Sequence, residues 1–274
     1  MTAPDIRLVV ADLDGTLLDE HKQMPSGTFE LISDLRAAGV AFAPASGRQW
    51  ATLASMFAPV ADDLVIIAEN GAYVTDRGRE VAVHPFAPGW AGDMIRQVET
   101  LADQGVDLGI VVCGVKSAWV TRTDRAFLDQ VEPYYRRLEI TDDLTRVDDT
   151  IIKLAVHDFG DLEAVTAPFL REHAAPNPVA VSGAHWVDVM AEGVDKGLAV
   201  RELQAEMGID ATQTMVFGDY LNDYEMLQAA DWSFAMSNGH PDILDVANYT
   251  APPNHENGVI RTVRSVLGLG APRS

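Results

Sequence analysis

Two carboxylates one residue apart stand at the end of an apolar run near the start of the chain. Asp12 and Asp14 follow residues 6–11, and Gly15 and Thr16 come directly after them. Like charges at the end of a strand repel each other and lose their water when they are buried. A bound cation would offset both effects. The alternative is a solvated surface turn, in which Asp and Gly are common.

Two further groups stand where a predicted strand ends or a predicted helix begins. Ser46-Gly47-Arg48 follows the predicted strand 40–45, and its hydroxyl and backbone N–H groups form a natural cradle for phosphate. Taken alone, this tripeptide is equally typical of a helix N-cap. Lys196-Gly197 begins another predicted helix, where a lone lysine is ordinarily a solvated charge.

The fourth group is Gly218-Asp219-Tyr220-Leu221-Asn222-Asp223, which follows an apolar strand. Asp219 could complete a shell of hard oxygen ligands for Mg²⁺ together with Asp12 and a backbone carbonyl. Asp223 could be a direct or water-mediated ligand, although its position also suits an N-cap.

Together these residues offer the components that phosphoryl transfer needs, which are a metal, a nucleophile, cations for the phosphate oxygens and an acid for the leaving group. Asp12 could attack phosphorus and form an acyl phosphate, which divides one difficult displacement into two easier ones. Asp14 could protonate the leaving alkoxide and then deprotonate the water that cleaves the intermediate. A carboxyl group can act as an acid at neutral pH when its surroundings disfavour its ionised form.

Alternating strands and helices surround these residues in both terminal parts of the chain. Predicted strands lie at 6–11, 40–45, 64–68, 214–217, 233–236 and near 249, and predicted helices at 26–38, 50–57, 196–207, 224–229 and 242–247. A hairpin with the turn Asp76-Arg77-Gly78 is expected between 72–75 and 80–83. This alternation predicts an α/β fold with a doubly wound parallel sheet, whose ligands lie beyond the carboxyl ends of its strands.

The middle of the chain follows a different, α+β pattern. Its predicted strands lie at 108–113, 118–122, 151–157, 179–182 and 186–190, and its predicted helices at 91–104, 125–135 and 162–173. About a hundred residues with their own apolar strands suffice for an independent domain. We therefore expect a core made of residues 1–82 and 191–274, interrupted by an inserted domain at 83–190.

The four groups, in this order and each on the expected element, resemble the motifs of the haloacid dehalogenase-like superfamily, and in detail those of its Cof-type phosphatases. The matching strings are Asp12-Leu13-Asp14-Gly15-Thr16-Leu17-Leu18, Ala45-Ser46-Gly47-Arg48, Lys196-Gly197 and Gly218-Asp219…Asn222-Asp223. Secondary agreement comes from Glu69-Asn70-Gly71-Ala72, Ala235-Met236-Ser237-Asn238 and Glu256-Asn257-Gly258-Val259. The resemblance covers essentially the whole chain and implies a Rossmann-like core.

The resemblance also implies a role for each matched residue. Asp12 would be the nucleophile and Asp14 the acid/base. Mg²⁺ would lie among the side chain of Asp12, the backbone carbonyl of Asp14 and Asp219, with Asp223 in support. The groups that hold the phosphoryl oxygens would be Leu13, Ser46, Gly47, Lys196 and Asn222. Tyr220 and Ser237 depart from the residues common in the family, but neither change removes a metal-binding or phosphate-binding group.

Within the superfamily, Asp14 indicates hydrolysis of a phosphate ester, because dehalogenases lack this second aspartate and the pump ATPases have threonine there. The inserted segment falls between Gly71 and Lys196, so it resembles a C2-type cap, which closes over the core and supplies side chains that specify the substrate. Cap residues that could face the substrate, or equally lie on the surface or in the core of the cap, are Lys116, Trp119, Arg122, His185, Trp186 and Asp188.

We therefore expect a Mg²⁺-dependent phosphatase that acts on a small phosphorylated metabolite, such as a sugar phosphate, FMN or pyridoxal phosphate. One alternative is a phosphomutase or phosphotransferase, in which a sugar hydroxyl replaces water. Another is a non-catalytic module that binds a phosphorylated metabolite and regulates another protein. The intact set of Asp12, Asp14, Lys196 and Asp219 argues against this last alternative.

Composition limits the remaining possibilities. The net charge of −21 argues against nucleic acid and an anionic membrane as partners. No apolar stretch approaches the roughly 20 residues that span a bilayer, and the N-terminus has no signal-like segment. Cys113, the single cysteine, cannot form an internal disulfide and is expected to be buried. A cytoplasmic location is the resulting expectation, and the sequence leaves monomer and homodimer open.

Overall fold

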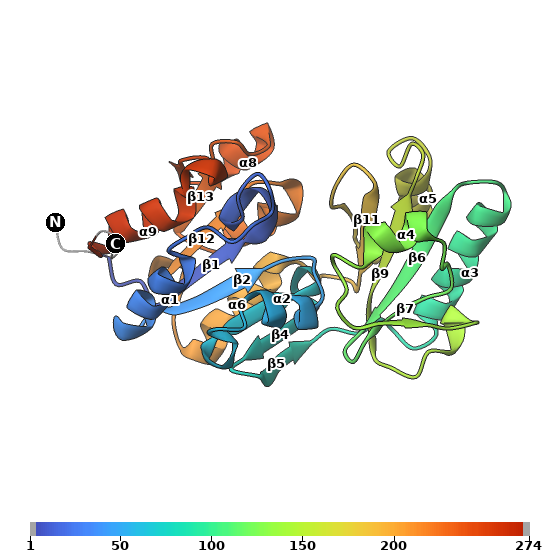
Figure 1. The fold of residues 1–274 in the computed structure, drawn as a ribbon, viewed down its shortest axis with the longest axis horizontal. Coiled ribbons are helices and arrows are strands. Elements are labelled where there is room, and N and C mark those ends of the chain that lie inside the picture. The colour runs from blue at the N-terminus through green and yellow to red at the C-terminus, as the bar shows by residue number, and fades with distance from the viewer. Residues whose placement is uncertain (1–3, 271–274) are drawn as a thin grey trace.

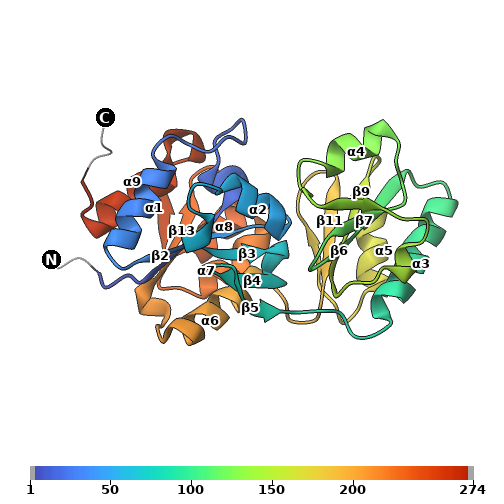
Figure 2. The same ribbon diagram turned by 60° about the horizontal axis from the view of Figure 1, so that its bottom comes forward.

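Two β-sheets organise the chain, and the computed structural model describes residues 4–270 (Figure 1). One sheet has eight strands from both terminal parts of the chain, and the other has six strands from the middle. The chain passes between them after β5 (Arg79–Val83), to reach α3 (Trp90–Asp103), and after β11 (Trp186–Met190), to reach α6 (Lys196–Met207) (Figure 2). The predicted fold class, an α/β doubly wound core with an inserted α+β unit, is confirmed.

Six parallel strands form most of the eight-stranded sheet, and an antiparallel hairpin extends one edge. In spatial order the strands are β14 (Tyr249–Ala251), β13 (Trp232–Met236), β12 (Thr214–Gly218), β1 (Leu8–Asp12), β2 (Ala41–Ala45), β3 (Val65–Ala68), β4 (Tyr73–Asp76) and β5. The strand order reverses at β1, which has β12 on one side and β2 on the other. Ligands of doubly wound sheets bind beyond the carboxyl ends of the strands at such a reversal.

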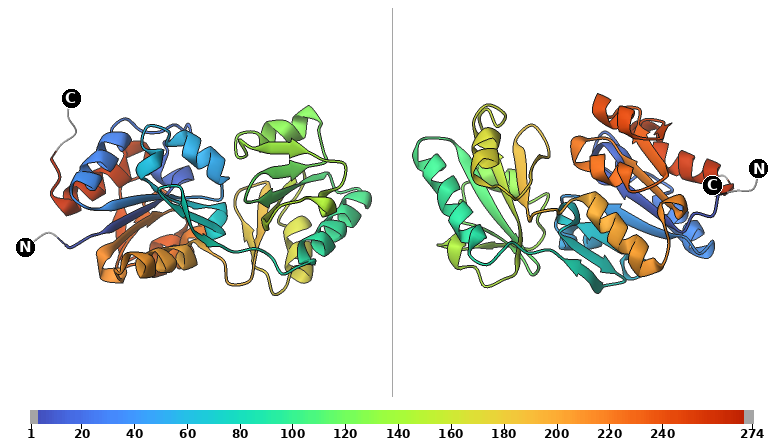
Figure 3. Two further views of the ribbon diagram at one scale, coloured as in Figure 1. Left: turned by 90° about the horizontal axis from the view of Figure 1, so that it is seen from below. Right: turned by 180° about the vertical axis from the view of Figure 1, so that it is seen from behind.

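Helices cover both faces of this sheet, as Figure 3 shows from two sides. On β1, Val9 and Ala11 belong to one cluster of buried apolar side chains, and Leu8 and Val10 to another. The helices of the first cluster are α1 (Thr28–Ala37), α2 (Trp50–Met56) and α9 (Gly258–Leu267), and those of the second are α6, α7 (Tyr224–Gln228) and α8 (Pro241–Val246). Because both faces are covered, β1 is a continuous apolar run rather than an alternating one.

The hairpin of β4 and β5 turns at Arg77 and Gly78, as predicted. Both residues have positive φ angles, 49° and 73°, which a tight two-residue hairpin requires. The chain then leaves the core along β5 (Figure 2).

The six-stranded sheet presents one face to its own helices and the other toward the core. Its spatial order is β10 (Val179–Val181), β11, β9 (Ile151–Asp158), β6 (Leu108–Gly114), β7 (Ala118–Val120) and β8 (Leu138–Ile140). On β9, Ile152, Leu154 and Val156 pack beneath α3 and α5 (Thr166–His173). Since side chains alternate along a strand, Lys153 and His157 lie on the opposite face. That face also carries α4 (Arg125–Val131), which packs over the buried Cys113.

The differences from the predicted elements lie mainly at helix ends and in short strands. The strand β8 and the C-terminal helix α9 were not predicted. The helices expected at 125–135 and 162–173 are shorter, because α4 ends at Val131, just before Pro133, and α5 begins only at Thr166. Among residues 4–270, no helix combines the length and the apolar character needed to cross a membrane.

Candidate active site

Lys196 lies between two carboxylates at the base of the site. It is the first residue of α6 and fully buried, and its Nζ lies 2.5 Å from Oδ1 of Asp12 and 2.7 Å from Oδ1 of Asp223. Burial disfavours the ammonium ion, but the two carboxylates outweigh this and raise the pKa of Lys196 above its ordinary value. Gly197 allows α6 to pack closely, because a Cβ there would lie 2.3 Å from the backbone oxygen of Glu225. Lys196 therefore stays charged beside Asp12.

Asp219 follows β12, the neighbour of β1, and so comes to lie beside Asp12. Oγ1 of Thr16 donates a hydrogen bond to Oδ1 of Asp219 at 2.7 Å. Gly15 has a φ of 87°, and a Cβ there would lie 2.3 Å from Oδ2 of Asp219. Nδ2 of Asn238 donates to the carbonyl of Gly15 at 2.8 Å, which fixes the loop from the C-terminal part of the chain. The glycine is therefore required for both its conformation and its size.

The acidic cluster fits a hard divalent cation. Carboxylate oxygens of Asp12, Asp219 and Asp223 lie within 4.8 Å of one another. With all three ionised, Lys196 balances one charge and leaves two, which a divalent cation would match. Burial and the charge of Asp223 raise the pKa of Asp219 to about 7. Oxygen donors of this kind are the ligands that Mg²⁺ and Ca²⁺ prefer.

The oxygens of Asp223 already have donors within the protein. Its Oδ1 accepts from Lys196, and its Oδ2 accepts from the backbone N–H groups of Asp219 and Tyr220 at 3.0 and 3.2 Å. Asp223 thus stands at the N-cap position of α7 without a side-chain capping hydrogen bond to that helix, and instead fixes the preceding turn and lies in the acidic cluster. Asp12 and Asp219 line the pocket that opens beside this cluster, whereas Asp223 does not.

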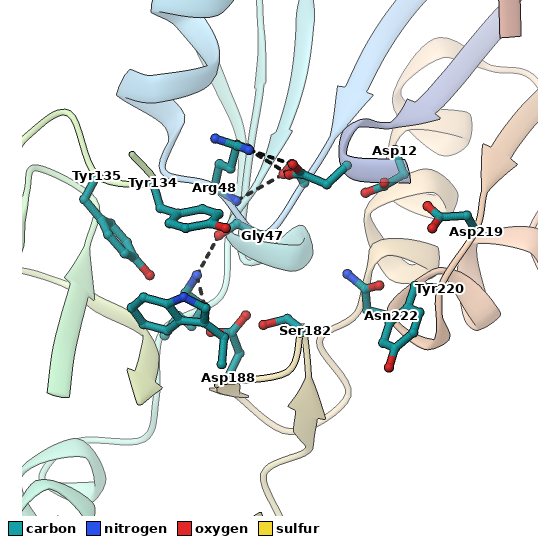
Figure 4. Close-up of a pocket in the computed structure, with 15 residues that line it drawn as sticks. Asp12, Gly47, Arg48, Tyr134, Tyr135, Ser182, Asp188, Asp219, Tyr220 and Asn222 are labelled. Atoms are coloured by element: carbon teal, nitrogen blue, oxygen red, sulfur yellow. Dashed lines mark hydrogen bonds and ion pairs between the residues drawn. The ribbon is translucent and has the colours of Figure 1, made fainter. Parts of the chain in front are cut away.

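Arg48 holds Asp14 at the mouth of the site through a bidentate ion pair (Figure 4). Its Nε lies 3.0 Å from Oδ2 of Asp14, and its Nη2 lies 2.8 Å from Oδ1. The side chain of Asp14 is 35% exposed, whereas that of Arg48 is 8% exposed. Arg48 also donates to the carbonyl of Pro133 at 3.2 Å and lies over the ring of Tyr134. It therefore joins the proposed acid/base to the six-stranded unit.

Three of the five predicted phosphate-binding residues, Ser46, Gly47 and Asn222, line one pocket with Asp12. Leu13 and Lys196 are fully buried and are not among its lining residues. Oγ of Ser46 accepts a hydrogen bond from the N–H of Arg48 at 3.2 Å. Leu13 buries its side chain in the core below the aspartates, which leaves its backbone for contact with a ligand.

This pocket has a volume of about 240 Å³ and lies between the two sheets (Figure 4). Its wall from the six-stranded unit consists of Tyr134, Tyr135, Lys153, Ser182, Gly183, Trp186 and Asp188. The rings of Tyr134 and Trp186 meet edge to face, with centroids 5.8 Å apart. Both walls thus carry polar groups, and the wall from the six-stranded unit adds the aromatic rings of Tyr134, Tyr135 and Trp186.

Two of the six residues named from the sequence as candidates to face the substrate lie in this wall, namely Trp186 and Asp188. The other four, Lys116, Trp119, Arg122 and His185, are not among the lining residues. Arg122 instead pairs with Asp107 and Asp124 at the surface.

The two departures from the family pattern have different surroundings. Tyr220 lines the pocket, with its ring edge-on to that of His240 at a centroid distance of 5.9 Å. Ser237 donates its backbone N–H to the carbonyl of Ala251 at 3.0 Å and is not among the residues that line the pocket. Of the two, Tyr220 is therefore the one placed to affect a ligand.

The sequence analysis missed three features of this site. It did not anticipate the pairing of Arg48 with Asp14, the aromatic wall of Tyr134 and Tyr135, or the buried Lys153. A signal for Lys153 was present, because it is the one cation inside the apolar strand 151–157. The tyrosines follow α4 and gave no comparable signal.

A family model described as haloacid dehalogenase-like hydrolase matches residues 9–263. The chain is 32% identical over 270 residues to a 5-amino-6-(5-phospho-D-ribitylamino)uracil phosphatase of Escherichia coli, covering 97% of this chain and 98% of that protein. A Bacillus subtilis protein of the same name is 22% identical over 272 residues, covering 96% and 98%.

Solved structures show the same fold. A protein from Eubacterium rectale superposes with a TM-score of 0.84 at 28% identity, covering 96% of this chain and 99% of that one. A Streptococcus mutans protein gives a TM-score of 0.87 at 22% identity, with the same coverage. The match therefore includes both sheets.

Proposed function

The chain belongs to the haloacid dehalogenase-like hydrolases, and from that premise we propose that it hydrolyses the phosphate monoester of a small metabolite with the help of Mg²⁺. The observation that carries this proposal is the arrangement at the pocket base. A buried carboxylate, Asp12, lies beside the fixed charge of Lys196, and a second carboxylate, Asp14, lies two residues away at the mouth.

In the proposed reaction, a carboxylate oxygen of Asp12 attacks phosphorus. A bond forms between this oxygen and phosphorus, and the bond from phosphorus to the ester oxygen breaks. Asp14 gives its proton to the departing alkoxide. The product is an acyl phosphate on Asp12 and a free alcohol.

In the second step, Asp14 takes a proton from water, and the water oxygen attacks the acyl phosphate. Inorganic phosphate leaves, and the carboxylate of Asp12 is restored. Through its two hydrogen bonds, Arg48 holds the carboxylate of Asp14 in one orientation during both steps.

The remaining polar residues would bind the phosphoryl group. Lys196 balances the charge of Asp12, while Ser46, the backbone of Leu13 and Gly47, and the amide of Asn222 would donate to the phosphoryl oxygens. Asp12, Asp219 and the backbone carbonyl of Asp14 would hold Mg²⁺, with Asp223 in support. When bound, the ion supplies positive charge that offsets the negative charge of the phosphate.

We also propose that residues 83–190 act as a cap that selects the leaving group. Support comes from the pocket, whose outer wall belongs wholly to this segment. The Escherichia coli relative is named for a substrate with a phosphorylated ribityl chain and a uracil ring. Tyr134 and Trp186 would suit a planar ring, so that compound, FMN, pyridoxal phosphate and sugar phosphates form the first substrate panel.

The test is phosphate release from this panel with Mg²⁺, with EDTA, and with the variant Asp12→Asn. We expect release that requires the metal and is lost in Asp12→Asn. The matched control is Asp142→Asn, at an exposed position outside the pocket, which should leave release unchanged. Loss of substrate without phosphate release would instead favour a phosphotransferase, and tight binding without turnover would favour a regulatory module.

A further inference from the structure

A second buried lysine, Lys153, lies where the six-stranded unit meets the core. It is on β9, on the face turned away from α3 and α5, and only 1% of it is exposed. A fully buried ammonium ion is costly unless its partners satisfy it. The identity of those partners therefore shows what this residue does.

Two of the three contacts of Lys153 lie on the core. Its Nζ is 2.6 Å from the carbonyl oxygen of Gly47 and 2.6 Å from Oε2 of Glu69. The third is Oδ1 of Asp188, on the adjacent strand β11, at 3.7 Å. Gly47 belongs to the proposed phosphate-binding loop, and Figure 4 shows Gly47 and Asp188 facing the same space. One cap lysine thus contacts the backbone that would bind phosphate.

A second chain of contacts leads from the cap to Asn222, another of the proposed phosphate-binding residues. Oδ2 of Asp188 accepts from Nδ2 of Asn70 at 2.8 Å, and Oδ1 of Asn70 accepts from Nδ2 of Asn222 at 3.2 Å. The side chain of Asn70 therefore orients the amide of Asn222 only while its own amide nitrogen donates a hydrogen bond to Asp188. Asp188 belongs to the cap.

The turn that carries Glu69 and Asn70 is bonded to the phosphate-binding loop. The N–H of Glu69 donates to the carbonyl of Arg48 at 3.1 Å, and the N–H of Asn70 donates to the carbonyl of Ser46 at 3.0 Å. Both turn residues have positive φ angles, 51° and 55°. Non-glycine residues in this region are strained by about 1–3 kcal/mol each and persist only where their surroundings fix them. The cap contacts are part of those surroundings.

The charges of this cluster do not cancel. Glu69 and Asp188, both buried, carry two negative charges when ionised, and Lys153 carries one positive charge. Buried ion pairs add little net stability, because desolvation offsets their attraction. If the cap moves away, water can solvate each group again. Such a contact is suited to an interface that must form and separate.

We propose that Lys153 and Asp188 are positioning residues, which fix the phosphate-binding groups Gly47 and Asn222 only when the cap is closed over them. The inference rests on the proposed phosphatase function. Its consequence is that phosphate binds well only to the closed form. The cap then contributes to binding of the phosphoryl group as well as to selection of the leaving group.

The test measures three properties of the variants Lys153→Met and Asp188→Ala, which are kcat, binding of inorganic phosphate with Mg²⁺ by calorimetry, and the free energy of unfolding. In Lys153→Met, we expect kcat to fall by about 10²-fold, as for a displacement of about 1 Å at a reacting group. Phosphate binding should weaken about tenfold or more, since Gly47 loses its donor. Lys116→Met is the control, because Lys116 is an exposed cap lysine outside the pocket.

Asp188→Ala separates positioning from a merely structural role. It leaves Lys153 and Glu69 as a balanced pair with no buried charge unpaired, so the loss of stability should be smaller than in Lys153→Met and limited to the lost acceptor of Asn70. Positioning predicts weaker phosphate binding by variant protein that urea unfolding shows to be folded, because Asn70 no longer has its acceptor. Inorganic phosphate has no leaving group, so direct contacts of Asp188 with the rest of a substrate do not affect this measurement.

The double variant Lys153→Met with Glu69→Gln is a second way to distinguish a positioning role from a structural role. Removing both charges should recover part of the stability lost in Lys153→Met, since only Asp188 is then left without its cation, but not the binding of phosphate. Recovery of both would overturn the proposal, as would phosphate binding of parental strength in Asp188→Ala. If the parent chain itself neither binds phosphate nor hydrolyses any ester, the proposed function has failed rather than this inference.

Discussion

The two buried lysines of this protein have similar partners but different geometry. Lys196 in the core and Lys153 in the cap are both 1% exposed or less, and each lies between two carboxylates. The partners of Lys196, Asp12 and Asp223, belong to the same sheet unit as the lysine. Lys153 instead has one carboxylate partner on its own sheet and one on the core, across the interface.

This difference separates a permanent arrangement from a reversible one. The contacts of Lys196 link strand ends and a helix start of one packed core, so they persist whatever the cap does. The contacts of Lys153 with Gly47 and Glu69 exist only while the two units touch, whereas its contact with Asp188 lies within the cap sheet. The same chemical group thus serves the reacting carboxylate in one place and, as proposed above, the closure of the cap in the other.

The largest expected effect comes from Lys196→Met. Removing one partner of a buried ion pair leaves charge unpaired and costs about 3–5 kcal/mol. Here Asp12 and Asp223 would both lose their cation, so we expect this loss of unfolding free energy and no measurable phosphate release. Urea unfolding and a phosphate assay measure the two effects. A Lys196→Met variant with kcat within tenfold of the parent would contradict the assignment of Lys196 to the reacting carboxylate.

A smaller effect is expected for Arg48→Met. Arg48 makes both a contact within the core, like Lys196, and contacts with the cap, like Lys153. It pairs with Asp14 inside the core and with Pro133 and Tyr134 of the cap. Loss of the guanidinium should disorder Asp14, and acid–base groups contribute about 10²–10⁴-fold, so kcat should fall by about 10²-fold. Unfolding free energy should change by about 1 kcal/mol or less, because Asp14 is partly solvated.

Steady-state kinetics with one substrate of the panel and urea unfolding give these values. The change should appear mainly in kcat, since the methionine can still pack against Tyr134. A variant that raises KM at unchanged kcat would place Arg48 in substrate binding instead of with Asp14.

The core end of the pocket could be predicted because each of its residues stands at the end of a recognisable strand. Asp12 ends β1, and Ser46 and Asp219 directly follow β2 and β12, and parallel strands bring their carboxyl ends to one edge. The apolar runs were long enough to identify the strands. The structure places these residues together as predicted, although their chemical roles remain proposals.

The cap end could not be predicted in the same way. Its lining comes from a loop after α4, from β9 and from the β10–β11 hairpin, which are far apart in the chain. Side chains alternate between the two faces of β9, so the sequence places Lys153 and Leu154 on opposite faces. No local signal indicates which of these faces meets the core. The unpredicted helix α9 is rich in β-branched residues, such as Val259 and Ile260, whose low helix propensity obscures an otherwise helical spacing.

The smallest expected effect concerns His157, which shares a strand face with Lys153 but has no carboxylate pair. It is 3% exposed, and its ring lies 4.9 Å from that of Trp186 and 5.7 Å from that of His185. Burial, and then the charge of His185, lowers the pKa of His157 to about 4. Asp158, Asp107 and Arg122 are the other charged groups that influence it.

A lowered histidine pKa makes the protein less stable in acid. Between about pH 6.5 and pH 4 the unfolded chain takes up a proton at this residue and the folded chain does not, so stability falls as pH falls, by at most about 1.4 kcal/mol per pH unit. His157→Gln should therefore show a flatter dependence of unfolding free energy on pH, whereas His255→Gln, at an exposed position, should follow the parent. Urea unfolding from pH 7.5 to 4.5 measures the slopes. Parallel curves for His157→Gln and the parent would show that the acid sensitivity does not arise at the buried imidazole, because only the variant lacks that group.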